Sequence, residues 1–232
     1  MIPQKTLSFL CSLFFLFSVI CVDSAHAQLS KRNWGLRFGL NAVSINNYEV
    51  YDAGDLLANT SYTNKNGYFI TGFARYNIDR FFLQPEIAWN EYRRTCSFSF
   101  PVEGANSIYP PINLDINSKN ISTNFLVGYN IINDYPFLFG AFFGSSFTGT
   151  FRTNYSMETD KTLSKTGFSL NYSGILGFSI NISRIYFDLR YEMCLPNADI
   201  NLKNIPDFPE NFKNVKIKKN ESILDFSVGM MF

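Results

Sequence analysis

The stretch 221–232 is the feature that most constrains the fold. Apolar residues occupy alternate positions from Leu224 to Phe232, and the positions between them are small or polar, as at Asp225 and Gly229. Successive side chains of a β-strand point to opposite faces, so this pattern predicts a strand with one apolar and one polar face. Because Phe232 follows with no polar tail after it, we expect this strand to close a barrel.

Seven further segments show the same alternation. In chain order they are 34–46, 67–78, 80–95, 119–130, 136–151, 166–180 and 184–195. Pro85 removes one hydrogen-bond donor from the third segment, so we expect a bulge or irregular pairing there. An even total of eight strands places both ends of the wall on the same side.

The connections between these strands alternate in length. Short, turn-forming connections lie at 77–80, 133–136 and 181–184, and long polar ones lie at 47–66, 94–118, 152–165 and 196–219. Short turns on one side and long loops on the other are typical of bacterial outer-membrane barrels, whose short turns face the periplasm. We predict one domain after the leader, with no linker.

The charged face of the strands distinguishes this architecture from a soluble eight-stranded ligand-binding barrel. Burying charges inside a soluble barrel costs several kcal/mol per ion unless every charge is paired. With the apolar face toward lipid, the charges line a polar lumen, and closure satisfies the backbone amides of every strand. The sequence therefore predicts an all-β fold, an eight-stranded antiparallel up-and-down transmembrane β-barrel. Its predicted lumen charge network consists of Arg37, Arg75, Glu86, Asp188, Arg190, Glu192 and Asp225.

The first residues are typical of an export signal, with an apolar run at 7–22 and an A-x-A cleavage site ending at Ala27. A transmembrane helix is the alternative, but it needs a run of about 20 apolar residues. A lipoprotein leader would need a small residue before Cys21, where Ile20 stands. The predicted parts are a signal peptide at 1–27 and an outer-membrane barrel domain at 28–232.

Composition excludes several functions. The formal net charge of +1 gives no basic surplus that would predict nucleic-acid binding. The one histidine, His26, falls in the leader, so the mature chain has none for nucleophile pairs or metal sites. We find no glycine-rich phosphate loop and no metal-ligand cluster. We therefore predict no enzyme, no catalytic residue, no cofactor and no metal; a carboxylate site on Glu86 or Asp188 is the remaining enzymatic alternative.

The lumen charges are the strongest candidate site. The simpler interpretation is a structural ion-pair network that fills a narrow barrel, and the alternative is a narrow ion path or a proton-active acid pair. Cys96 and Cys194 also face inward, on the third and seventh strands, which are opposite in a barrel about 16 Å across. A disulfide needs Cα atoms within about 7 Å, so these two can bond only if the loops fold over the mouth.

Residues near the predicted strand ends suggest contacts with the membrane surface. The basic run of Lys213, Lys216, Lys218 and Lys219 is either solvated surface or a contact for lipopolysaccharide phosphates. Aromatic residues near the strand ends predict an interfacial girdle. Its predicted members are Tyr48, Tyr51, Tyr62, Tyr68, Tyr76, Trp89, Tyr92, Tyr129 and Tyr135.

Four segments resemble the PorT-like outer-membrane β-barrel family, and the resemblance covers nearly the whole mature chain. They are 35–41, 83–88, 187–191 and 226–232. The resemblance implies the barrel fold, the outer membrane, and a role for Phe232 as the signal recognised by the barrel-assembly machinery. Some members assist an envelope secretion system.

From these observations we expect a structural or partner-binding role carried by the long extracellular loops. A small, passive, porin-like channel for ions or small solutes is the alternative. The expected partners are outer-membrane lipid and lipopolysaccharide, the barrel-assembly machinery and an envelope protein.

Overall fold

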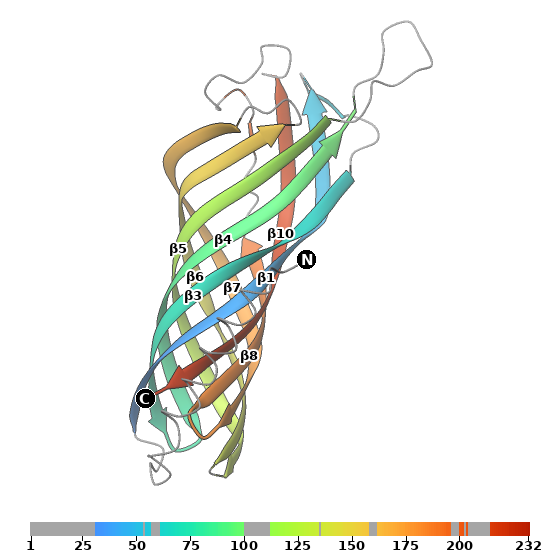
Figure 1. The fold of residues 1–232 in the computed structure, drawn as a ribbon. Helices are drawn as coiled ribbons and strands as arrows, with labels where there is room; N and C mark the ends of the chain where they lie inside the picture. Colours follow the sequence, from blue (N-terminus) through green and yellow to red (C-terminus); the bar gives the residue numbers. More distant parts are fainter. Residues whose placement is uncertain are drawn as a thin grey trace, which may run out of the picture.

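The computed structural model describes residues 31–52, 54–56, 61–99, 112–134, 136–157, 162–195, 200–201, 203 and 214–232. They form a tall, twisted barrel of antiparallel strands (Figure 1). The predicted signal peptide lies outside the described residues. Within the described residues, no helix is long and apolar enough to span a bilayer.

Eight long strands make up the barrel wall, and each pairs with its neighbour in antiparallel fashion. They are β1 (Arg32–Asp52), β3 (Ser61–Ile78), β4 (Phe81–Phe98), β5 (Ile112–Asp134), β6 (Phe137–Met157), β7 (Thr162–Ile182), β8 (Ile185–Leu195) and β10 (Val215–Met231). Two short strands, β2 (Asp55–Leu56) and β9 (Ile200–Asn201), pair with β1 and β10. The barrel closes where β1 pairs with β10, from Gly35 opposite Met231 to Asp52 opposite Val215. The predicted fold is confirmed.

The three short turns lie where they are predicted, at one end of the barrel. Asp79 and Ser183 adopt φ values of 53° and 57°, which lets β3 turn into β4 and β7 into β8 within two residues. The long connections are shorter than predicted, because the strands continue into them. For example, β5 begins at Ile112 rather than near Lys119.

Of the bulge or irregular pairing predicted at Pro85, the structure shows irregular pairing and no bulge. The register of β4 with β3 is the same on both sides of this proline, at Phe73 opposite Glu86 and Tyr76 opposite Leu83. Pro85 itself pairs with Phe125 of β5 in an unbroken register. Gln84 and Pro85 of β4 have no paired residue on β3, but neither strand contains an extra residue at this point.

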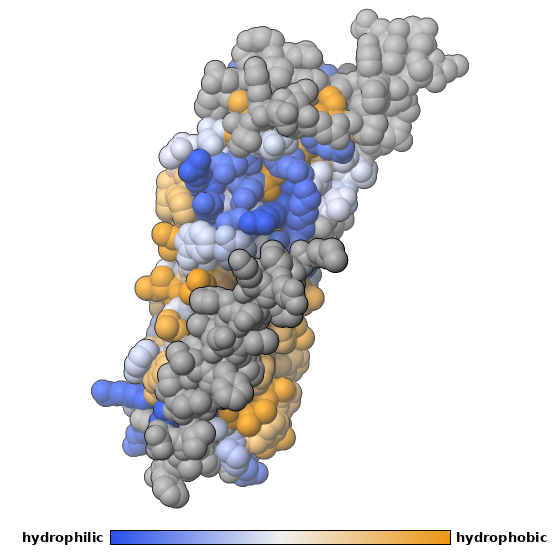
Figure 2. All heavy atoms as spheres, in the orientation of Figure 1, coloured by the Kyte–Doolittle hydropathy of each residue, from blue (hydrophilic) through white to orange (hydrophobic). Residues whose placement is uncertain are grey.

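The half of the barrel next to the short turns, here called the membrane half, has an apolar outer surface. Each of the eight long strands has an outward apolar side chain that leaves between 46% and 66% of its surface exposed. These side chains include Phe38, Ile70, Ile87, Phe125, Phe143, Phe178, Leu189 and Phe226. In Figure 2, orange hydrophobic atoms gather over this half. A continuous apolar surface of this extent is suited to lipid and not to water.

The other half, here called the outer half, has the opposite polarity. Leu114 and Ile116 of β5 point inward and are at most 1% exposed, whereas Asp115 and Asn117 face out. The inward apolar side chains form one packed group, the outer apolar cluster. It consists of Val50, Cys96, Phe98, Leu114, Ile116, Tyr155, Val215 and Ile217. Blue hydrophilic atoms cover the upper wall in Figure 2, so this half is built like a small water-soluble barrel.

Three register shifts mark the level at which the polarity reverses. They lie between Ile45 and Asn47 of β1, between Lys65 and Tyr68 of β3, and at the step from Thr150 to Arg152 of β6. An extra residue changes which face the following side chains occupy. In β1, odd-numbered residues face inward below the shift, whereas Val50 faces inward above it.

The bulge in β3 depends on a glycine. A Cβ on Gly67 would lie 1.9 Å from the backbone oxygen of Glu91 and 2.4 Å from Oδ1 of Asn41. Only glycine lets the two backbones approach this closely.

The predicted aromatic girdle is partly correct. Tyr68 and Trp89 face outward with their rings 5.6 Å apart, and Tyr76 and Tyr129 are exposed. The prediction is wrong for Tyr62 and Tyr92. Tyr62 packs against the outer apolar cluster because β3 changes phase at its bulge, and Tyr92 lies in the inward phase of β4. The side chains of Tyr48 and Tyr135 lie outside the described residues.

Because the polarity reverses, replacing an outward-facing residue by arginine should lower the free energy of unfolding in the membrane half much more than in the outer half. Ile87→Arg places a cation at the middle of the lipid-facing band and should lower the free energy of unfolding by about 2–4 kcal/mol. Thr63→Arg, on the outward face of the outer half, should change it by less than about 0.5 kcal/mol. Urea unfolding in phospholipid vesicles measures both, and equal costs would contradict the assignment of the lipid-facing band.

Candidate functional site

Four charged side chains meet at the centre of the membrane half. Arg37 from β1 lies 2.9 Å from Oε2 of Glu86 on β4 and 3.3 Å from Oδ1 of Asp188 on β8. Arg190, also on β8, contacts the same two carboxylates, with Nη1 2.7 Å from Oε2 of Glu86. All four residues are at most 3% exposed. Each carboxylate therefore lies between two guanidinium groups, and the group of four is electrically neutral.

Neutral side chains satisfy the remaining oxygens of this group. Asn124 donates to Glu86 over 2.9 Å, and Gln84 donates to it over 2.6 Å. Ser227 donates to Asp188 over 2.6 Å, and Tyr186 donates to it over 3.1 Å. Buried charges are stable only when paired and hydrogen-bonded in this way. The charges and their neutral partners thus form a rigid group that ties five strands together across the lumen, namely β1, β4, β5, β8 and β10.

Arg75, the third arginine of the lumen, lies nearer the short turns and touches neither carboxylate directly. Its Nε donates to Gln84 over 2.5 Å and its Nη2 donates to Tyr186 over 3.3 Å. Its guanidinium carbon also lies 4.0 Å from the centre of the Phe82 ring. Arg75 therefore joins the group only through its neutral neighbours and an aromatic face.

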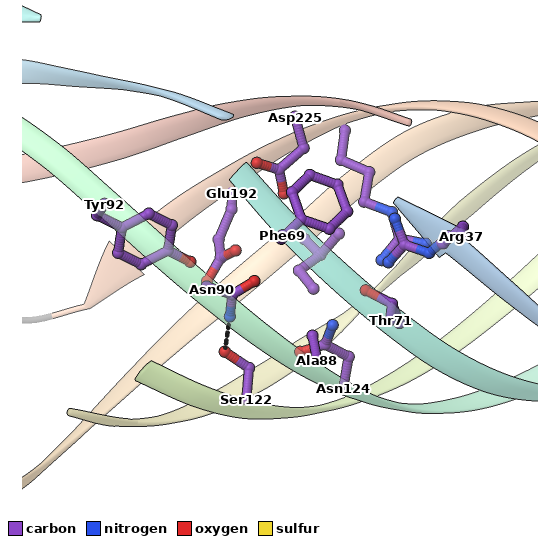
Figure 3. Close-up of a pocket in the computed structure, with 12 residues that line it drawn as sticks. Arg37, Phe69, Thr71, Ala88, Asn90, Tyr92, Ser122, Asn124, Glu192 and Asp225 are labelled. Atoms are coloured by element: carbon purple, nitrogen blue, oxygen red, sulfur yellow. Dashed lines mark hydrogen bonds between the residues drawn. The ribbon is translucent and has the colours of Figure 1, made fainter. Parts of the chain in front are cut away.

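Glu192 and Asp225 lie apart from the four central charges, toward the outer half. Glu192 accepts a short hydrogen bond from Ser173, and Asp225 faces Arg190 across the β8–β10 ladder. Both carboxylates line a small cavity with Asn90 and Tyr92 (Figure 3). The predicted set of seven is therefore divided into a central four, an indirectly joined arginine and this pair of carboxylates.

The predicted charge network does not include several neutral lumen residues, although the strand alternation already predicts that they face inward. Gln84, Asn124, Tyr186 and Ser227 all occupy the inward phase of strands that were correctly predicted. Considering only charged residues left these neutral donors out. The pairing of Arg37 with Glu86, 49 residues apart in sequence, depends on barrel register and carries no sequence signal.

Packed side chains fill the lumen both above and below the charges. Phe73, Tyr186 and Met231 pack together toward the short turns. Phe82, Leu126, Phe142 and Ile175 form a second buried group beside the charges. The outer apolar cluster fills the far end, with Val50, Leu114 and Ile217 at 0% exposure. The described residues therefore fill the lumen with packed side chains at three levels, as expected of a barrel of eight strands.

The two inward-facing cysteines are not joined in a disulfide. Cys96 is buried in the outer apolar cluster, whereas Cys194 is partly exposed near the end of β8. The two strands that carry them do not pair with each other.

The central charges should be far more sensitive to substitution than an exposed ion pair. Glu86→Gln leaves Arg37 and Arg190 with one carboxylate between them and should lower the free energy of unfolding by about 3–5 kcal/mol. Asp115→Asn, which removes the half-exposed pair with Lys65, should cost at most about 1 kcal/mol. Urea unfolding in detergent micelles measures the free energy of unfolding of both variants. A Glu86→Gln variant as stable as the control would show that the pairs are not formed.

Comparisons with known proteins agree with this architecture. The sequence matches the family model described as outer membrane protein beta-barrel domain over residues 26–199. No curated protein matches the sequence. The solved structure of OprG from Pseudomonas aeruginosa is 15% identical, with a TM-score of 0.51 and coverage of 86% of this chain and 95% of OprG.

A second solved structure, Ail, the attachment invasion locus protein of Yersinia pestis, is 14% identical. It has a TM-score of 0.39, with 88% of this chain and 100% of Ail covered. At these identities the likeness to OprG shows the fold alone. The family match spans most of the chain, and the chain therefore belongs to the outer-membrane protein β-barrel family of the bacterial outer membrane.

Proposed function

We propose that this protein is an outer-membrane anchor that does not conduct along its axis and that presents its outer half to a partner at the cell surface. The filled lumen is the observation that carries this proposal. Apolar clusters lie on both sides of the central charges, and the charges are almost completely buried. A passive, porin-like channel would need the space that these side chains occupy.

The height of the barrel supports the second part of the proposal. The longest strand, β5, has 23 residues. At about 3.3 Å per residue and a tilt of about 40°, it rises roughly 58 Å along the barrel axis. The apolar band of such barrels is about 25 Å tall, so roughly half of the wall stands outside the lipid. A wall of this height is suited to holding a binding surface away from the membrane.

The outer surface of β3, β4 and β5 carries an ordered set of polar side chains above the lipid. Lys65 lies 2.8 Å from Asp115, and Glu91 accepts hydrogen bonds from Tyr68 and Arg93. Burial opposes ionisation of Asp115, but hydrogen bonds from Lys65 and Thr95 outweigh it and lower the pKa of this carboxyl. The surface therefore holds fixed charges of both signs at neutral pH, which favours a polar protein partner.

The role that we propose is structural and is not catalytic. It is compatible with assistance to envelope secretion or assembly, as the resemblance to PorT-like proteins implies. Contacts with lipopolysaccharide through this basic run are part of the same proposal, since β10 carries Lys216 above the lipid-facing band. The side chains of Lys218 and Lys219 lie outside what the structure describes. The fourth lysine of the run, Lys213, lies outside the described residues.

Site-specific photocrosslinking in cells tests the partner role. A photoreactive amino acid at Asn113, on the outward face of the outer half, should give a discrete protein adduct. The same group at Phe125, on the same strand but facing lipid, should give none. Planar-bilayer recordings complete the test: steady single-channel currents, or adducts equally abundant at both positions, would refute the proposal.

Phe232 is proposed to be the signal that the barrel-assembly machinery recognises. Its ring stacks on Trp34 with centroids 4.6 Å apart, and its backbone exchanges two hydrogen bonds with that residue across the closing seam. Deleting Phe232 should reduce the outer-membrane level of the protein without preventing refolding in detergent, because the rest of the seam remains. Heat-modifiable gel mobility measures refolding, and normal outer-membrane levels of the truncated protein would contradict this assignment.

A further inference from the structure

Two cations lie side by side on the outer surface, at the level where its polarity reverses. β5 and β6 are neighbours in the barrel wall (Figure 1), and Lys119 of β5 lies directly opposite Arg152 of β6. Both face outward; Arg152 is exposed and Lys119 is partly exposed. Directly opposite residues of neighbouring strands have Cβ atoms about 4.5–5.5 Å apart, and like charges at this separation repel each other. An anion that binds both side chains of this cation pair would remove the repulsion.

The bulge in β6 brings Arg152 to the outer surface. Ser146 and Thr148 of this strand face the lumen and are 1% and 6% exposed, so an unbroken strand would also turn Arg152 inward. The register shift between Thr150 and Arg152 adds one residue and reverses the phase of the strand. The fold therefore places this arginine beside Lys119 by a specific irregularity of β6.

The other charges on the outward faces of β3, β4 and β5 near this level are already paired. Lys65 lies 2.8 Å from Asp115, and Arg93 lies 2.6 Å from Glu91. Glu91 is directly opposite Lys119 in the ladder, but its ion pair is with Arg93. No carboxylate in the described part of the chain forms an ion pair with either member of the cation pair. The surface therefore has two positive charges in excess at this point.

Neutral side chains hold the guanidinium group of Arg152 in one orientation. Its Nε donates to Oδ1 of Asn154 over 3.1 Å, and its Nη2 donates to Oγ of Ser164 on β7 over 3.4 Å. Ser164 in turn donates to Asn154 over 2.8 Å. Both acceptors are uncharged, so they position the guanidinium group without neutralising it. A side chain that is already ordered loses less conformational entropy when it binds a ligand.

The cation pair lies at the height of the lipid headgroups. Below it, the outward side chains of Ile121 on β5 and Phe147 on β6 are 52% and 43% exposed. Lys119 is ten residues along β5 from Tyr129, an exposed aromatic residue near the short turns. At about 3.3 Å per residue and a tilt of about 40°, this separation rises roughly 25 Å, which is the height of the apolar band in such barrels. Because the short turns face the periplasm, the cation pair is level with the outer leaflet.

We propose that Lys119 and Arg152 bind a phosphate group of lipid A, the phosphorylated glycolipid that anchors lipopolysaccharide in the outer leaflet. A phosphate monoester carries a charge of about −1.5 to −2 at neutral pH, which balances the two cations. Guanidinium groups donate to phosphate oxygens in bidentate fashion, and the acyl chains of the same lipid extend down along the apolar band. This site is independent of the contact proposed for Lys216, because β10 pairs with neither β5 nor β6. It also goes beyond the anchoring role, which does not require a bound lipid.

Binding of lipid A to the folded protein in neutral detergent tests the site directly, with native mass spectrometry as the measurement. The double substitution Lys119→Gln and Arg152→Gln should weaken binding at least about tenfold, because it removes charge-assisted hydrogen bonds to the phosphate. Lys65→Gln combined with Arg93→Gln is the matched control, since it removes the same charge from cations that are already paired. The control should weaken binding by no more than about threefold, because these charges act on the phosphate only through screening solvent. Equal affinities of the wild type and the first double variant, or equal weakening by the control, would overturn the proposal.

Two further ligands show which part of the lipid is recognised. Dephosphorylated lipid A keeps its sugars and acyl chains, and it should bind the wild-type protein about as weakly as intact lipid A binds the Lys119→Gln and Arg152→Gln variant. Millimolar inorganic phosphate should not displace intact lipid A, because it lacks the acyl chains that lie against the apolar band. Equal binding of the two forms of lipid A would overturn the phosphate contact. Displacement by inorganic phosphate would assign the site to a soluble anion and would also overturn the proposal.

The urea midpoint of unfolding gives a second readout, which also shows that the variant folds. In neutral detergent alone, the Lys119→Gln and Arg152→Gln variant should unfold at a urea concentration no lower than the wild type, because the substitutions remove the repulsion between like charges. Added lipid A should raise the midpoint of the wild type and not that of the variant, since a ligand that binds only the folded state stabilises it. A rise of the same size in both proteins would overturn the proposal.

Discussion

The fold depends on one constraint, which is that every backbone amide within the lipid must have a hydrogen-bond partner. The pairing of β1 with β10 meets this constraint by joining the first and last strands over 17 pairs of residues. Closure then determines where side chains point, because alternate residues face either lipid or a narrow lumen. The lipid-facing residues need only be apolar. The inward-facing residues must fill a fixed space and neutralise one another, which explains why Arg37, Glu86, Asp188 and Arg190 share so many contacts.

The same constraint is relaxed above the lipid, and the chain changes its composition accordingly. Outside the bilayer the wall faces water, so Asp115 and Asn117 lie outside while Leu114 and Ile116 pack within. The barrel is thus stabilised by two different means along one continuous sheet. Buried ion pairs hold the membrane half together, and ordinary hydrophobic burial holds the outer half together.

The sequence predicts the membrane half well and the outer half poorly, for a physical reason. Period-two alternation with an apolar outer face is the signal used to find strands, and it predicts the eight strands and the inward phase of Arg75. Above the lipid that signal reverses, so residues such as Leu114 were assigned to a long loop. Tyr62 was assigned to the interface because a bulge that shifts phase has no clear mark in the sequence. The grouping of the lumen charges depends on barrel register, which local patterns do not contain.

The bulges at the polarity boundary also affect how the protein can change in length. At Asn46 of β1 the chain has one residue more than its partner β10, and alternation resumes beyond it with Val50 inward. Loss of this one residue would restore an uninterrupted strand and leave every side chain above and below on the face it now occupies. Elsewhere in a strand, a one-residue deletion turns all the following side chains to the wrong face. A single-residue deletion is therefore tolerated best at this boundary, where β1 can lose a residue while the half embedded in lipid stays unchanged.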